Sequence, residues 1–481
     1  MNFNTKEIIH EVRNEFEDLL DFVTKDAKLM QISEAERGIW QKLLQIGYLL
    51  LKTYFQTRCE AYGREALRTD GGQKISFVAE KEQRFYSIFG VMKIARPYFY
   101  KKGEGGFSPL DELLGLGGDI YSEMLREMHE ELSVDMAYGR AIKFMNRFLT
   151  IKLSTRVLQQ LVQTDAEDVV AFYDKKEVPP VKSQGEILVV QADGKGVPML
   201  ITELDGKKQT RKKESVVTTV YSINPNPRTP DEVLTTFFDK AEPSDKQARN
   251  RPQNKEVWAT LKGKDTALQR LYWQVEQREG DHFQHRVALC DGDDALQSRL
   301  QSHLPRFTLI LDFIHANEYL WDAANTLFSE DDPRRDEWMQ RHARQLLASE
   351  TSQLIISLAQ QAQNGETTPP QQLALTKAAN YFKRNTPFMD YKSYLAQGFP
   401  IASGVIEGAC RHLVKDRMEL SGMRWVQTTA ESLLQLRAVS ENEDWDAYHL
   451  FRRQCRQRRL YHPEKSTDFV PTLYHQLPLG F

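Results

Sequence analysis

Hydrophobic residues near the start of the chain recur at three- and four-residue steps. One set runs from Ile8 to Val23, and a second apolar stretch runs from Trp40 to Phe55. Side chains at this spacing share one face of an α-helix. The pattern predicts that residues 1–70 are helical, and it favours packing of the apolar faces within one subunit over pairing between subunits.

Between residues 83 and 102 the period of the pattern changes. Two apolar runs, 85–89 and 91–96, flank Gly90 and predict a β-hairpin. The next segment, 97–102, mixes aromatic residues with cations, as nucleic-acid surfaces do. An aromatic strand packed on its neighbours, with solvated lysines, explains the same composition equally well.

Helical spacing returns between residues 109 and 175. Ser133 is placed to cap a helix that runs to Phe148, and Ser154 is placed to cap the next one. Two helices joined by a short turn are compatible with a DNA-binding helix-turn-helix. Plain helical hairpins are more common, so the pattern alone favours a hairpin.

An α/β pattern follows a linker at 179–185. Apolar runs predict strands at 187–193, 216–221, 286–291 and 307–312, and helical spacing predicts helices at 256–277 and 294–303. Near-continuous apolar strands joined by helices are typical of a sheet covered on both faces.

A polar helical stretch from 322 to 398 interrupts this pattern, which resumes at Ser403. The stretch contains a loop rich in Gly, Thr and Pro at 365–370, and we expect it to be an insertion. Past residue 440 the chain becomes rich in arginine, with Arg452, Arg453, Arg456, Arg458 and Arg459 close together.

Composition narrows the class of protein. At 481 residues, about two to four domains are expected. The 41% apolar and 27% charged residues exclude disordered and fibrous proteins, and the net charge of −3 requires any nucleic-acid surface to be local. Four cysteines without a CxxC pair argue against a zinc site or a disulfide framework. With no apolar leader and no membrane-length apolar run, the sequence predicts an unanchored cytoplasmic protein.

Two predicted strands end on an aspartate. Asp193 and Asp291 each close an apolar run and are each followed by glycine. Ligand groups of α/β proteins gather at the carboxyl edges of strands. Either aspartate alone is explained as a turn residue or a helix cap, but together with a third acid they suggest a cage of oxygen ligands for Mg²⁺.

The third acid is Glu407. Ser403 is placed to cap its helix, and Arg411 and Lys415 follow Glu407 at four-residue steps on one polar face. A surface ion pair explains this arrangement. So does a metal-binding carboxylate beside cations that hold DNA phosphates.

Asp312 and His315 end the next predicted strand and its turn. They could bind a metal, or orient its ligands. The sequence has no GxxxxGK[ST] motif and no GxGxxG motif after a strand, which argues against ATP use.

The segments around these acids resemble those of bacterial insertion-sequence DDE transposases. The closest group is the ISKra type, within the wider Mutator-like set, and the resemblance spans roughly residues 75–445. It is carried by Asp193–Pro198, Cys290–Gly292, Asp312–His315 with Tyr319–Trp321, Ser403–His412 with Arg417, and Gly422–Trp425.

The resemblance implies an RNase H-like α/β core, a mixed five-stranded sheet with helices on both faces. A mainly helical N-terminal region with the hairpin would serve DNA binding or dimerisation. The expected divisions are 1–180 for that region, 181–321 for the first part of the core, 322–399 for an all-α insertion, 400–440 for the last core helix, and 441–481 for a basic tail.

The resemblance also implies a catalytic triad of metal-binding acids, Asp193, Asp291 and Glu407. They would hold two Mg²⁺ ions, for which Mn²⁺ can substitute, to cleave transposon ends and join the 3′-OH to target DNA. Asp312 and His315 fit a C/DxxH motif that follows the second acid in Mutator-like relatives. Asp293 and Asp312 remain alternatives for the second acid, and Asp291 is favoured because it directly ends its strand.

The resemblance implies that the partners are terminal inverted repeats and target DNA, bound by a homodimer at the bacterial nucleoid. It implies no membrane association and no nucleotide cofactor. Candidate DNA contacts are Arg411, Lys415, Arg417, Arg424, Trp425, Lys212 and Lys213, with Lys207, Lys208, Arg211 and the arginine-rich tail as further phosphate contacts. Two alternatives stay open: an inactive DNA-binding regulator derived from a transposase, and a structure-directed nuclease.

Overall fold

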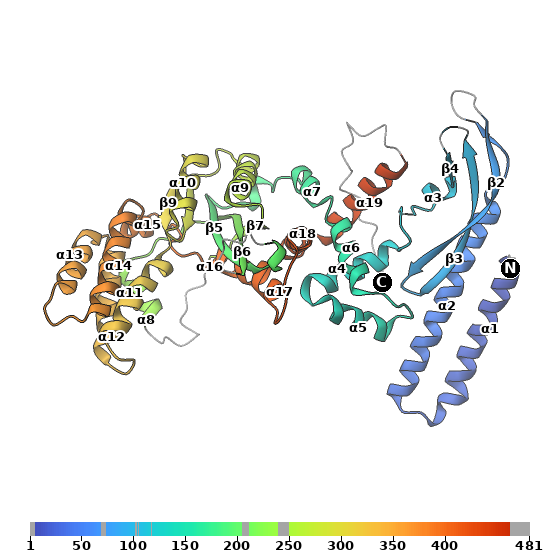
Figure 1. Ribbon diagram of the computed structural model, residues 1–481, viewed down its shortest axis with the longest axis horizontal. Coiled ribbons are helices and arrows are strands. Elements are labelled where there is room, and N and C mark those ends of the chain that lie inside the picture. Colours follow the sequence, from blue (N-terminus) through green and yellow to red (C-terminus); the bar gives the residue numbers. More distant parts are fainter. Residues whose placement is uncertain are drawn as a thin grey trace. The chain divides into compact units, whose positions relative to one another are not determined.

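The computed structural model describes residues 5–68, 74–101, 103, 105–116, 118–203, 211–238 and 250–461. The chain forms two compact units (Figure 1). The first combines Met1–Lys175 with Asp444–Phe481, and the second is Lys176–Glu443. Lys207 and Lys208 lie outside the described residues.

The first unit begins with the predicted pair of helices, α1 (Thr5–Thr24) and α2 (Ile32–Ala61), which pack against each other. The predicted hairpin follows as β2 (Lys74–Ser87) and β3 (Gly90–Lys101). Its turn needs Gly90, whose φ of 137° is unfavourable for residues with a Cβ. The short strands β1 (Leu67–Arg68) and β4 (Gly105–Phe107) complete a sheet of order β1-β2-β3-β4.

The aromatic segment of β3 packs mainly on its neighbours. Phe99 is fully buried against Phe77, and Lys81 Nζ lies 3.2 Å from the centre of the Tyr98 ring. Phe55 of α2 packs edge-on against Phe85 of β2. These contacts explain Phe99 and Tyr98 by packing, whereas Tyr100 is 49% exposed and the side chains of Lys101 and Lys102 lie outside the described residues.

Short helices make up the rest of this unit: α3 (Pro109–Leu113), α4 (Glu123–Asp135), α5 (Tyr138–Phe148), α6 (Thr155–Asp165), α7 (Val169–Lys175) and α19 (Trp445–Tyr461). Ser154 caps α6 as predicted, because its hydroxyl accepts a hydrogen bond from Val157 N at 3.3 Å. The predicted cap at Ser133 is wrong. Ser133 is buried inside α4, whose apolar stripe continues to Val134, and α5 begins only after Ala137.

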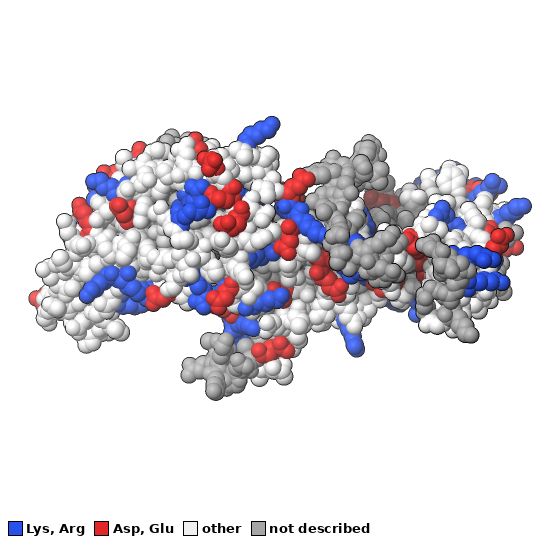
Figure 2. Space-filling model, turned by 90° about the horizontal axis from the view of Figure 1, so that it is seen from above, with Lys and Arg blue, Asp and Glu red and all other residues white. Residues whose placement is uncertain are grey.

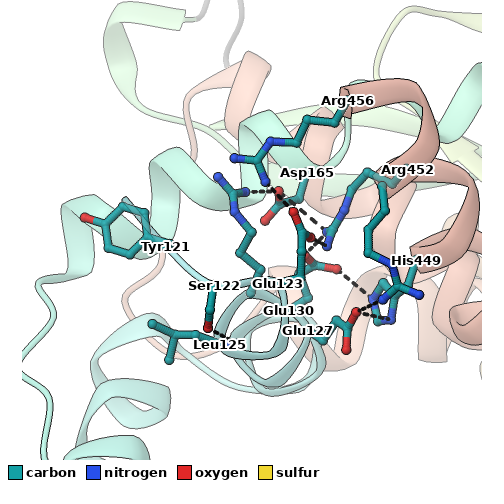
Figure 3. Close-up of polar contacts among 12 residues, drawn as sticks. Tyr121, Ser122, Glu123, Leu125, Glu127, Glu130, Asp165, His449, Arg452 and Arg456 are labelled. Carbon is teal, nitrogen blue, oxygen red and sulfur yellow. Dashed lines mark hydrogen bonds and ion pairs between the residues drawn. The ribbon is translucent and has the colours of Figure 1, made fainter. Parts of the chain in front are cut away.

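The arginine-rich segment is a helix of the first unit, where its charges meet acidic residues of α4 and α6 (Figure 3). Arg452 is 1% exposed and bonds Glu130 and Glu123, and Arg456 bonds Glu123 at 2.7 Å. Asp165 lies 3.5 Å from Arg452. Arg452 and Arg456 are therefore occupied by carboxylates instead of forming a free basic tail, and residues 462–481 of the predicted tail lie outside the described residues.

The second unit is built on a mixed five-stranded sheet of order β7-β6-β5-β8-β9. Its strands are β5 (Ile187–Pro198), β6 (Lys212–Ile223), β7 (Gln253–Thr260), β8 (His285–Cys290) and β9 (Thr308–Leu311). Strand β6 is antiparallel to both β5 and β7, whereas β5, β8 and β9 run parallel. This arrangement is compatible with an RNase H-like fold.

Strand β7 is a correction to the sequence analysis, which predicted a helix from residue 256. Residues 257–260 are buried in the edge strand, and α9 (Lys264–Arg278) begins after Gly263, whose φ is 97°. The predicted helix included Val257 and Trp258, which are β-branched and aromatic residues that suit a strand.

Helices cover both faces of this sheet. On one face, Leu188 and Val190 pack with α9 and with α10 (Asp294–His303). On the other face, Val189 and Leu289 belong to a core shared with helices of the predicted insertion. The helices on that side are α8 (Pro230–Phe238), α11 (Phe313–Leu327), α12 (Pro333–Leu347), α13 (Thr351–Ala362), α14 (Pro369–Asn385) and α15 (Tyr391–Ala396).

The chain then returns to the sheet through α16 (Gly404–Ala409), a π-helix at Cys410–Lys415, α17 (Asp416–Met418) and α18 (Gln427–Glu441). None of the helices within the described residues is long and apolar enough to cross a membrane.

Candidate metal centre

Three of the candidate acids lie at one edge of the second sheet. Strands β5, β8 and β9 are parallel, so their carboxyl ends point the same way. Asp291 directly follows β8 and Asp312 directly follows β9. Asp193 lies in β5, two residues beyond the pairing of Gln191 with Leu289, and is therefore level with Asp291. Parallel pairing thus brings together residues far apart in sequence.

Asp312 is the most enclosed of these acids, with no exposed surface. One carboxylate oxygen accepts a hydrogen bond from Ile314 N at 2.7 Å and so caps α11. The other lies 2.9 Å from His315 Nδ1 and accepts a hydrogen bond from the Ser403 hydroxyl. Asp312 therefore ties the end of β9 to the segment that carries Glu407.

Glu407 meets this pair directly. Ligand atoms of Asp312, His315 and Glu407 all lie within 4.8 Å of one another, which makes them a potential metal-binding group among the described residues. Glu407 is exposed, His315 is partly buried and Asp312 is buried, so the group opens to solvent on the side of Glu407. The two carboxylates suit Mg²⁺, and together with the imidazole, once the cation displaces its proton, they suit Mn²⁺.

Helix α16 is held against β5 by two contacts that the sequence analysis missed. Gln191 is fully buried, and its side-chain oxygen accepts a hydrogen bond from Ile406 N at 2.8 Å. One turn further on, Cys410 Sγ donates to Asp193 Oδ2 at 3.3 Å. Asp193 and the helix of Glu407 therefore lie on the same face of the sheet.

Ser403 is at the predicted cap position but does not cap the helix with its side chain. Its hydroxyl bonds Asp312, so the buried amide of Gln191 provides the acceptor that the first turn of α16 needs. The signal for Gln191 was present in the sequence. It is the one amide inside the apolar run 187–192.

The helix changes to π geometry directly after Ala409. π-Turns inside helices often accompany functional sites. Here the wider turn starts at Cys410, the residue that bonds Asp193.

The electrostatics indicate crowded negative charge. Burial raises the pKa of Asp291, and the neighbouring Asp193 raises it further. Partial burial of its carboxyl group raises the pKa of Glu407, and the charge of Asp312 adds to the rise. The hydrogen bond with Asp312 raises the pKa of His315 to about 9, although burial opposes this. Burial is the larger cause for both carboxyl groups, and a divalent cation would offset the smaller part that comes from repulsion between the acids.

The loop that carries Asp291 is supported by the helical insertion. Tyr381 of α14 stacks on Tyr319 of α11 with ring centres 3.7 Å apart, and Arg384 donates to Gly292 O at 2.5 Å. Gly292 has a φ of 60°, and a Cβ there would lie 2.7 Å from the Tyr381 ring. The second alternative acid, Asp293, caps α10 through Leu296 N.

The candidate DNA contacts divide into two groups. Lys212, Lys213, Arg411, Lys415 and Arg424 are exposed or partly exposed. Four of them contact neighbours: Lys212 bonds Glu419 and Lys213 bonds Gln427, each at 2.6 Å, Arg411 lies 3.7 Å from Asp416, and Arg424 donates to Met423 O at 2.6 Å. Arg417 and Trp425 are buried instead. The Arg417 guanidinium lies 5.1 Å from the Trp425 ring centre, and Trp425 pairs with the end of β5, so both hold the interior together.

On the face that Figure 2 shows, acidic and basic side chains of the described residues are interspersed.

No family model and no curated protein matches the sequence. Among solved structures, the chain is similar to "Drosophila P element transposase strand transfer complex", with 8% identity and a TM-score of 0.26. That similarity covers 68% of this chain and 80% of the other. A TM-score this low carries no inference about fold or activity.

Proposed function

We propose that the second unit is the RNase H-like core of a DNA transposase of the bacterial insertion-sequence DDE type. The observation that carries the proposal is that Glu407 of α16 comes within ligand distance of Asp312 and His315 at the sheet edge where Asp193 and Asp291 also lie, although those two are outside that group among the described residues. Asp312, His315 and Glu407 lie within metal-binding distance, and Asp193 is bonded to the helix of Glu407. The sequence resemblance around the same acids supports the same conclusion.

The residues present fit a divalent metal, because carboxylate oxygens from separate elements converge where their charges repel. Asp193, Asp291 and Glu407 would be the principal ligands of two Mg²⁺ ions. Asp312 approaches Glu407 more directly than the sequence analysis expected, and is either a ligand itself or the group that orients His315. Bound there, the metal would activate water or a 3′-OH and stabilise the leaving oxygen.

The protein's own part in this reaction is positioning. Gln191 and Cys410 fix α16 on β5, Ser403 fixes the Asp312 carboxylate, and Arg384 holds the loop after Asp291. The exposed cations Arg411 and Lys415 follow Glu407 and would contact DNA phosphates beside the metal. No covalent intermediate on the protein is required for this chemistry.

The proposal is tested with a plasmid that carries the DNA on both sides of the gene as donor. Asp193→Asn and Glu407→Gln should each abolish Mg²⁺-dependent nicking and joining while leaving DNA binding and folding unchanged. Asp291→Asn and Asp312→Asn, compared side by side, identify the second acid, since the true one should be as severe as Glu407→Gln. Glu276→Gln removes a carboxylate elsewhere in the same unit and should stay active.

Full activity of Glu407→Gln would reject the proposed site. DNA binding without nicking by the wild-type protein would favour the regulator. Cleavage of branched DNA without any joining of a 3′-OH would favour the nuclease.

A further inference from the structure

The segment between α4 and the end of α6 carries an unusual charge pattern. Between Asp135 and Asp165 the chain has no acidic residue. In the same interval it has five cations, Arg140, Lys143, Arg147, Lys152 and Arg156. In a protein with a net charge of −3, such a stretch is a local source of positive potential.

Helix α5 places three of these cations on one exposed face. Arg140, Lys143 and Arg147 follow at steps of three and four residues, and all three are exposed. The opposite face is anchored, because Ala141 and Met145 are 0% and 1% exposed. Phe144 lies between the cations and is 48% exposed. The amphipathic helix thus turns its basic side to solvent.

These cations differ from the arginines of α19, which are occupied by acidic partners. Within the described part of the chain, Arg140, Lys143 and Arg147 form no ion pair with any carboxylate. Their charges are therefore available to a ligand.

The helix is also held as a rigid element. Only Met136 and Ala137 separate it from α4. Leu125 and Met145 belong to one buried cluster, and α4, α5 and α6 pack against one another (Figure 1). Trp40 of α2 donates to Phe148 O at 2.8 Å and secures the far end. A short turn leading into a supported, exposed helix is the arrangement that places a helix in the major groove.

We infer that the Arg140–Lys143–Arg147 face of α5 binds duplex DNA by contacting backbone phosphates from the major groove. A helix with its side chains is about 10–12 Å across, which matches a groove about 12 Å wide. The three cations span about 10 Å along the helix axis, enough to reach several phosphates. The inference rests on the proposed function for its partner, and it names the surface that holds the DNA.

The test measures binding of a fluorescently labelled mixed-sequence duplex to the full-length protein, in EDTA, over a series of salt concentrations. The variant is Arg140→Gln, Lys143→Gln and Arg147→Gln combined, because glutamine keeps a high helix propensity. The matched control replaces Arg13, Lys28 and Arg37 by glutamine, which removes equal charge from exposed sites in the same unit. Circular dichroism checks that both variants fold.

The α5 variant should bind more weakly, and the slope of log affinity against log salt should fall by about 0.9 for each phosphate that is no longer neutralised, about 2.7 for the three cations together. The control should keep the wild-type slope. An unchanged slope in the α5 variant, or an equal fall in the control, would overturn the inference. So would wild-type binding to anionic phospholipid vesicles in preference to duplex DNA.

The two proposals fail separately. Glu407→Gln, tested in parallel, should bind the duplex as wild type does. If the wild-type protein binds through α5 but never nicks or joins DNA, the proposed function fails and this inference stands. If the α5 variant binds as well as an active wild type, this inference fails and the proposed function stands.

Discussion

Replacing Gln191 by leucine should loosen the helix that carries Glu407 without touching any proposed metal ligand. Leucine has nearly the same volume but offers neither the acceptor for Ile406 N nor the donor for the Tyr221 hydroxyl, which lies 3.3 Å from Gln191 Nε2. It also removes the acceptor of the longer hydrogen bond that the Thr219 hydroxyl donates to Gln191 Oε1 at 3.5 Å. All three groups lie in a region where Gln191 is fully buried, Tyr221 is 2% exposed and Thr219 is 1% exposed.

The expected loss of stability follows from these groups. A buried polar group left without a partner costs about 1–3 kcal/mol. Since Ile406 and Tyr221 are both 2% exposed and the bond from Thr219 is long, we count two full penalties and expect a total of about 2–6 kcal/mol. Urea unfolding, fitted with a common slope for both proteins, measures it.

The informative readout is metal affinity. Gln191 supplies the acceptor at the start of α16, the helix that carries Glu407. Because its loss should leave Glu407 less firmly positioned, Mn²⁺ binding should weaken, and titration calorimetry measures this. Gln274→Leu is the matched control, since Gln274 is 5% exposed and bonds Glu256, which keeps Arg278 as a partner. The control should lose stability and keep the wild-type Mn²⁺ affinity. Equal Mn²⁺ affinities in Gln191→Leu and wild type would refute the role given to Gln191.

Three further predictions concern the packing around polar groups in each unit. Arg452→Met should destabilise the first unit by about 3–5 kcal/mol, because it removes the cation that neutralises the buried Glu130 and leaves only His449 beside it. Thermal unfolding checks this, and adding Glu130→Gln should restore much of the stability. Gly292→Ala should cost about 1–3 kcal/mol in urea unfolding, since φ is 60° and the new Cβ meets Tyr381; a neutral result would show that this loop can shift. Burial lowers the pKa of His129 from 6.5 to about 4. As the pH drops from 6.5 towards 4, His129 is therefore protonated in the unfolded chain but not in the folded one, and the free energy of unfolding should fall by up to about 3 kcal/mol. His129→Gln should flatten this pH dependence.

The strands that hold the site could be predicted from the sequence because their apolar runs are nearly continuous. The structure confirms strands in the regions 187–193, 216–221, 286–291 and 307–312, and the helix predicted at 294–303. Strand β7 was missed, since an edge strand followed closely by a helix leaves only a short run of apolar residues to recognise. The local pattern of apolar residues predicts whether a segment is a helix or a strand more reliably than it predicts the residue at which the segment begins.

The contacts inside the site depend on pairing between distant segments, which the sequence does not display. The prediction that the Ser403 side chain caps its helix was wrong, because the Ser403 hydroxyl donates a hydrogen bond to Asp312 at the end of β9 instead. Arg417 looked like a DNA contact and is buried beside Trp425. The arginines near residue 452 were expected to form a free tail, but they contact acids far away in the sequence, with Arg452 and Glu130 separated by 322 residues. In each case a tertiary partner decides the role.

The most direct test of the proposed metal centre is anomalous diffraction from a crystal of the protein soaked in Mn²⁺. The proposed site predicts a strong peak within ligand distance of Glu407 and of at least one of Asp193, Asp291 and Asp312. Glu407→Gln crystals treated in the same way should lose most of it. A wild-type crystal with Mn²⁺ bound only elsewhere, or with no peak between these carboxylates, would contradict the central claim.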